Sequence, residues 1–145
     1  SIAGPISIAS KGLSSAIFAR DQITAFYLAQ EAVEFIRNKR DQNSLKGSDW
    51  LAGLGACFGG KLCTVDIKDT TGSAVKVCPN DICPAINYDS TTDFYTYLGG
   101  KSSIFTREVK MEEINSTEAS ITVTLSWNTG INTKRFSIKE HILDW

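Results

Sequence analysis

Histidine is nearly absent from this sequence, because His141 is the single one in 145 residues. A histidine-dependent triad needs a nucleophile, and the G-x-S-x-G motif of many serine hydrolases does not occur in the chain. We interpret His141 as an exposed residue of an alternating strand. We therefore expect the protein not to be an enzyme, to have no catalytic residues and to use no cofactor.

An excess of charge of one sign is also lacking, since 15 lysines and arginines stand against 16 aspartates and glutamates. Nucleic-acid binding usually requires a basic surface that neutralises phosphates. The one basic cluster, Arg37, Lys39 and Arg40, ends a helical pattern, where cations complement the negative end of the helix dipole. We expect no nucleic-acid partner.

Proline is absent between Pro5 and Pro79, so nothing interrupts a long helical pattern in the first part of the chain. Apolar residues recur there at three- and four-residue steps, which predicts one helix over residues 5–41. Pro5 suits the first turn, where its missing N–H group costs nothing. Lys11, Arg20 and Asp21 interrupt the apolar pattern, so this helix is not a transmembrane span.

The predicted helix is too long for its own domain. It would measure roughly 55 Å at 1.5 Å per residue, whereas a domain of this size has a radius of gyration of about 15 Å. Its C-terminal half carries the wider apolar face and should pack on the rest of the chain. Its N-terminal half should project and requires a partner.

The second half of the chain predicts an antiparallel sheet. Residues 62–68 and 74–79 form a hairpin pattern around "DTTG", residues 80–102 look like loop, and three longer strands follow at 103–114, 118–127 and 133–143. Short links between these three strands indicate a meander. The clearest alternation places four apolar residues on one face: Ile121, Val123, Leu125 and Trp127. We expect a single α+β domain over residues 1–145, made of a helix (5–41), a loop and hairpin region (42–102) and a meander (103–145), with the helix covering the apolar face of the sheet.

The four cysteines all lie in one segment of 27 residues: Cys57, Cys63, Cys78 and Cys83. Zinc sites favour shorter Cys-x2-4-Cys gaps, and the five-residue gap after Cys57 is too wide. Disulfides tolerate both gaps, so we expect two disulfides and an oxidising compartment. Local pairs, Cys57–Cys63 and Cys78–Cys83, are preferred. A nested pairing of Cys63 with Cys78 and Cys57 with Cys83 stays open.

Several polar patterns could carry chemistry, but we prefer a structural interpretation of each. The glycine-rich residues 42–60 have no Walker or dinucleotide-binding motif. Glu31 and Glu34 share a helix face, where we expect a polar rim or partners for basic residues. The loops also contain six acidic or amide side chains that match no EF-hand spacing, and we expect no metal site there: Asp66, Asp69, Asn80, Asp81, Asp89 and Asp93.

Three stretches together resemble bacterial type IV pilin-like proteins, in particular the minor pilin and pseudopilin group. They are "YLAQEAVEFIRNKRDQN", the glycine/tryptophan loop "DWLAGLGACF" and the strand end "VTLSWNTG". The helix matches the pattern Leu-Ala-x-Glu-x-x-Glu-x-x-Arg-x-x-Arg-Asp at Leu28, Ala29, Glu31, Glu34, Arg37, Arg40 and Asp41. The resemblance implies a long helix whose C-terminal half packs on an antiparallel sheet, with a disulfide-bonded loop region.

The resemblance also implies a function, that of a structural subunit in a type IV pilus-type filament at the cell surface. Its partners would be other pilin subunits and, before assembly, the inner membrane, through an apolar segment of roughly twenty residues expected upstream of Ser1. The filament contact would be made by Ile6, Ala9, Leu13, Ala16 and Ile17. The sheet would be held by Leu28, Ala32, Val33, Phe35 and Ile36.

Two other functions remain open at this point. A type II secretion pseudopilin would have a similar fold and would form a short periplasmic assembly. An extracellular sugar- or ion-binding module would instead use the loop region from Cys57 to Gly100 as its binding surface.

Overall fold

A single long helix, α1, runs from Ala3 to Leu45 in the computed structural model, which describes residues 3–145 and the side chains from Ser10 onward. It ends four residues later than the sequence pattern predicts. The N–H of Ser48 donates to the carbonyl of Asn43, and that of Gly47 donates to the carbonyl of Ser44. Gly47 has a φ of 67°. These bonds form a Schellman motif, in which a left-handed glycine closes the helix and satisfies its last carbonyls.

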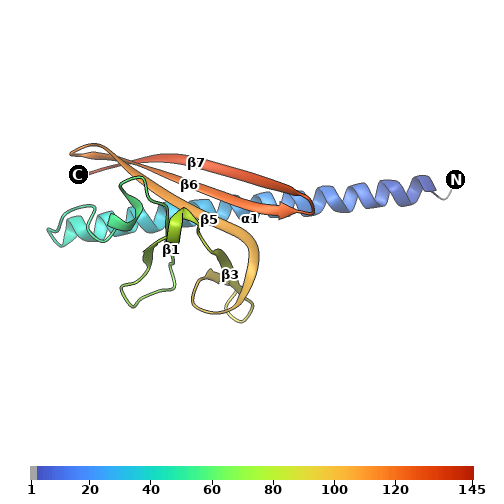
Figure 1. Ribbon diagram of the computed structural model, residues 1–145, viewed down its shortest axis with the longest axis horizontal. Helices are drawn as coiled ribbons and strands as arrows, with labels where there is room; N and C mark the ends of the chain where they lie inside the picture. The colour runs from blue at the N-terminus through green and yellow to red at the C-terminus, as the bar shows by residue number, and fades with distance from the viewer. Residues whose placement is uncertain (1–2) are drawn as a thin grey trace.

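Three long strands form the expected antiparallel meander. They are β5 (Lys101–Asn115), β6 (Glu118–Thr129) and β7 (Asn132–Leu143). The register places Val109 opposite Val123, and Val123 opposite Ile138. All three lie on the face that α1 covers, and Figure 1 shows the three strands running beside the helix. The fold is therefore α+β, with one helix packed on an antiparallel sheet.

The other edge of β5 carries two small hairpins. The first joins β1 (Cys63–Val65) to β2 (Val75–Val77), as the sequence predicts, and β1 pairs with β5 at Val109. The second joins β3 (Ala85–Asp89) to β4 (Phe94–Thr96), and β3 pairs with the beginning of β5. The prediction of loop over residues 80–102 was wrong for these two strands. Both are short, and they form because β3 pairs with the edge of β5 and β4 then pairs with β3.

The core lies between the C-terminal half of α1 and the meander. The predicted helix residues Leu28, Ala32, Val33 and Ile36 are fully buried, and Phe35 is partly buried against them. The sheet side of this core is formed by Ile121, Val123, Leu125 and Trp127, none of which is more than 2% exposed. Burying this apolar surface is the main stabilising contribution to the fold.

Two disulfides staple the loop region. Cys57 is bonded to Cys63 and Cys78 to Cys83, which is the local pairing. The first bridge links a short 3₁₀ helix, η1 (Gly55–Cys57), to β1, and both of its sulfurs lie in the core cluster. The second closes the loop around another 3₁₀ helix, η2 (Pro79–Asp81). No cysteine is left for a zinc site or for thiol chemistry.

Candidate functional site

One row of residues on α1 faces away from the sheet, and we call it the outer stripe. Its members follow each other at three- and four-residue steps, so they share one side of the helix. All of them are exposed except Gln30, which is half-buried. The outer stripe consists of Leu13, Ala16, Arg20, Ile23, Tyr27, Gln30, Glu34 and Asn38.

The outer stripe changes character part-way along the helix. Leu13 is 64% exposed, Ile23 is 70% exposed and Tyr27 is 53% exposed. Arg20 is the one charged member before Tyr27, and from Gln30 onward every member is polar. The apolar part therefore has no cover within its own chain, while the polar part needs none. An exposed apolar surface of this kind is a typical interaction site.

The filament residues implied by the resemblance lie on or beside this apolar part. Leu13 and Ala16 belong to the outer stripe, and Ile17, next to them, is 42% exposed. The side chains of Ile6 and Ala9 lie outside the described residues. Figure 1 shows the N-terminal part of α1 extending beyond the turn between β6 and β7. This end of the helix has no sheet to pack on.

The β6–β7 turn adds further apolar surface near the projecting part of the helix. Nζ of Lys134 lies 5.5 Å from the ring centre of Phe18. Ile131, at the tip of the turn, is fully exposed. The rings of Phe26 and Phe136 meet edge to face, with their centres 6.0 Å apart. Apolar side chains thus continue from the helix onto the last strand.

The charged residues in the C-terminal half of α1 form ion pairs within the helix and with the sheet. Glu31 pairs with Arg107 of β5, and Arg37 bridges Glu34 of the helix and Glu140 of β7. The expectation that Glu31 and Glu34 are partners for basic residues is therefore confirmed.

Arg40 fixes the end of the chain against the helix. Its Nη1 donates to the carbonyl of Leu143, and its guanidinium lies 4.6 Å from the ring centre of Trp145. Its Nε donates to the carboxylate of Asp41. Arg40 thus holds the end of β7 through side-chain contacts. The expectation that the basic cluster complements the helix dipole was wrong, because α1 continues to Leu45 and its last turn contains no basic residue.

The acidic loop residues accept hydrogen bonds that close turns or connect neighbouring strands. Asp66 is buried and accepts hydrogen bonds from the N–H of Lys68 and of Tyr97 and from the hydroxyl of Thr96. It thereby ties the β1–β2 hairpin to β4. Asp69 accepts from the N–H and hydroxyl of Thr71, which hold its pKa below the ordinary value. Among residues 3–145, no three His, Cys, Asp or Glu side chains are grouped so that they could hold a metal ion.

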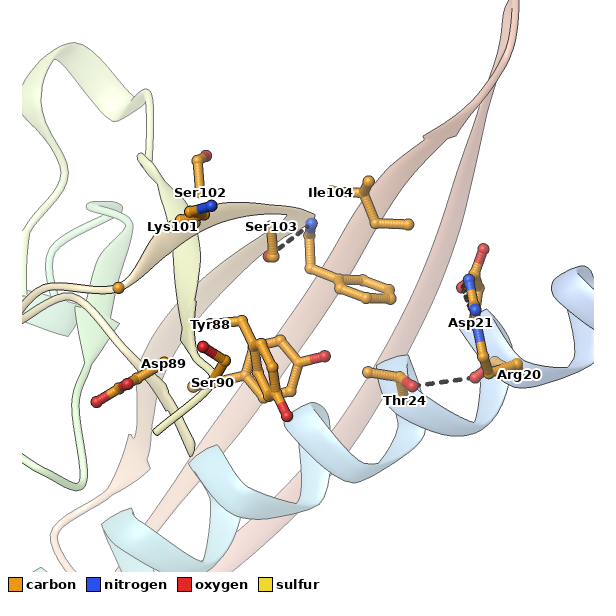
Figure 2. Close-up of a pocket in the computed structure, with 13 residues that line it drawn as sticks. Arg20, Asp21, Thr24, Tyr88, Asp89, Ser90, Lys101, Ser102, Ser103 and Ile104 are labelled. Carbon is orange, nitrogen blue, oxygen red and sulfur yellow. Dashed lines mark hydrogen bonds and ion pairs between the residues drawn. The ribbon is translucent and has the colours of Figure 1, made fainter. Parts of the chain in front are cut away.

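A groove of about 860 Å³ lies between the middle of α1 and the sheet. Figure 2 shows Arg20, Asp21 and Thr24 on its helix side, facing Tyr88 to Ser90 and the beginning of β5. The close approach of the chain at Gly100 to Tyr88, in the groove wall, requires glycine. A Cβ atom at this position would lie 2.6 Å from the carbonyl oxygen of Tyr88. The φ of 79° at Gly100 also favours glycine.

Sequence reasoning missed both Arg107 and this groove. Arg107 follows the alternation of Phe105, Val109 and Met111, so its inward position could have been derived from the strand period alone. The groove has no comparable signal, because its walls come from three separate segments of the chain.

Comparison with known proteins gives no relative: no family model, no curated protein and no solved structure matches the chain. In the part of the chain that the structure describes, no helix is both long and apolar enough to cross a membrane.

Proposed function

We propose that the protein is a structural, non-enzymatic subunit of a type IV pilus-type filament that assembles through the N-terminal part of α1. The observation that carries this proposal is the outer stripe. From Leu13 to Tyr27 its members are exposed and, apart from Arg20, apolar or aromatic, and from Gln30 to Asn38 all of them are polar. Because exposed apolar surface is unfavourable in water, the first part requires a partner and the second does not.

Three further features support a filament of similar subunits. The helix pattern from Leu28 to Asp41 resembles that of pilin-like proteins. The apolar surface extends along a rod rather than around a pocket, and rods of this kind pack side by side with other helices. Head-to-tail contacts between such subunits produce an open helical array. The two disulfides fit an oxidising compartment, as expected at the cell surface.

A photo-crosslinking experiment in the native host tests this proposal. A benzoylphenylalanine is placed at Ile23 in the apolar part of the outer stripe and, as a matched control, at Asn38 on the same face. We expect Ile23 to crosslink to another filament subunit in the sheared surface fraction, and Asn38 to give no such product. Equal yields at the two positions, or no subunit crosslink at Ile23, would contradict the proposal.

A further inference from the structure

The groove beside α1 contains a carboxylate that its own protein satisfies incompletely. The side chain of Asp21 is only 7% exposed, whereas that of its partner Arg20 is 71% exposed. Among the described residues, Arg20 alone hydrogen-bonds this carboxylate, through Oδ1, at 3.2 Å and 3.4 Å. A carboxylate removed from water needs several donors, and an exposed arginine is a weak source of them. Asp21 therefore remains available to accept from a ligand.

Aromatic rings form the opposite wall. The ring centres of Tyr88 and Tyr95 are 5.1 Å apart, and Tyr95 meets Phe105 edge to face at 6.3 Å. The phenol of Tyr88 donates to Asp93 at 2.6 Å, which fixes the orientation of the ring. Burial raises the pKa of the Tyr95 phenol. The wall is thus a fixed apolar surface with polar tips.

The charges that line the groove balance. Arg20 and Lys101 carry positive charge, and Asp21 and Asp89 carry negative charge. The carboxylate of Asp89 is already occupied by hydrogen bonds from Thr91 and Thr92. The hydroxyls of Ser90 and Ser102 also line the groove. This composition favours a neutral ligand with hydroxyl groups over an ion or a strongly charged molecule.

We propose that this groove binds a neutral saccharide, with a sugar ring against Tyr88 and Tyr95 and a sugar hydroxyl donating to Asp21. A pyranose has an apolar C–H face and a rim of hydroxyls that donate and accept, which matches one aromatic wall facing one polar wall. The groove volume of about 860 Å³ lies within the range of small-ligand sites. The site uses residues of one chain and does not depend on filament assembly.

An NMR titration of the 145-residue chain tests the site. Maltotriose, cellotriose, N-acetylchitotriose and lactose are added separately to the ¹⁵N-labelled protein at millimolar concentration. With at least one of them we expect saturable shifts confined to amides of groove residues, such as Asp21, Thr24, Ser90 and Ser102. Figure 2 labels these four residues around the groove, which is where we expect the shifted amides to lie.

Matched variants connect the shifts to the proposed contacts. Tyr88→Ala should weaken binding about tenfold through loss of the aromatic contact, and Asp21→Asn should also weaken it. Tyr27→Ala removes an exposed tyrosine of α1 that does not line the groove, and it should leave the affinity unchanged. Unchanged shifts elsewhere in each spectrum show that the variant is folded.

Three results would overturn the proposal. The first is the absence of shifts with all four sugars. The second is an affinity that Tyr88→Ala and Tyr27→Ala change equally. The third is a set of shifts at the same amides that follows protein concentration without sugar, which would assign the groove to a second copy of the chain.

Discussion

Nη1 of Arg107 on β5 lies 2.9 Å from Oε1 of Glu31 on α1, inside the core. The Arg107 side chain is 0% exposed and that of Glu31 is 7% exposed. The same guanidinium donates to the carbonyls of Leu28 and Val65, so it connects the helix, the central strand and β1. A charge pair at this depth is held by its own hydrogen bonds and by the further hydrogen bonds that satisfy the guanidinium.

The first prediction concerns the removal of one charge from this pair. Arg107→Met should lower the free energy of unfolding by about 3–5 kcal/mol, because it leaves the carboxylate of Glu31 buried without a partner. Adding Glu31→Met should recover part of the loss. Urea unfolding with the disulfides intact measures both variants. A double variant less stable than Arg107→Met alone would show that the pair is not coupled in this way.

The second prediction compares two leucines of the same helix. Leu28→Ala should cost about 2–5 kcal/mol of unfolding free energy, since it leaves a cavity at a fully buried site. Leu13→Ala should leave the stability of the single chain almost unchanged, since Leu13 is 64% exposed. Similar losses at both positions would be incompatible with the division of α1 into a packed and a projecting part.

The third prediction distinguishes the two disulfides. Each closes a loop of similar length, for which the chain-entropy model gives about 2 kcal/mol. Replacing Cys57 and Cys63 by alanine should cost more than replacing Cys78 and Cys83, because only the first pair belongs to the core cluster. Thermal unfolding of the two double variants measures the order, and the reverse order would contradict it.

The fourth prediction concerns the pH dependence contributed by Asp69. Hydrogen bonds from Thr71 lower the pKa of this carboxyl in the folded state below the ordinary value of an aspartate. A lowered folded pKa stabilises the protein above that value, and the contribution disappears as the pH falls through the folded pKa. We therefore expect the hairpin that contains Asp69 to lose stability in acid, below the ordinary aspartate range.

A titration of the Asp69 carboxyl carbon by NMR checks this mechanism. Thr71→Val removes the hydroxyl donor and should move the pKa of Asp69 up towards its ordinary value. Thr70→Val is the matched control, because the hydrogen bonds to Asp69 come from Thr71. An identical pKa in the wild type and in Thr71→Val would exclude the hydroxyl as the cause.

Much of the fold could be predicted from local patterns. The period of two from Ile121 to Trp127 indicates a strand with one buried face, and the proline-free stretch after Pro5 indicates a long helix. Short cysteine gaps favour the local disulfides. The strands β3 and β4 escaped prediction because each is short, β3 depends on pairing with β5, and β4 pairs only with β3.

By itself, the sequence determined the elements whose signal is a local period: the helix, the three long strands and the face of each that is apolar. The tertiary structure alone decided what those faces meet. It brings Arg107 to Glu31 across the core, leaves the side of α1 with Ile23 uncovered and forms the groove beside Asp21. The physical reason is that periodicity is a property of neighbouring residues. Burial, ion pairing and grooves depend on the distance between segments, which no local pattern contains.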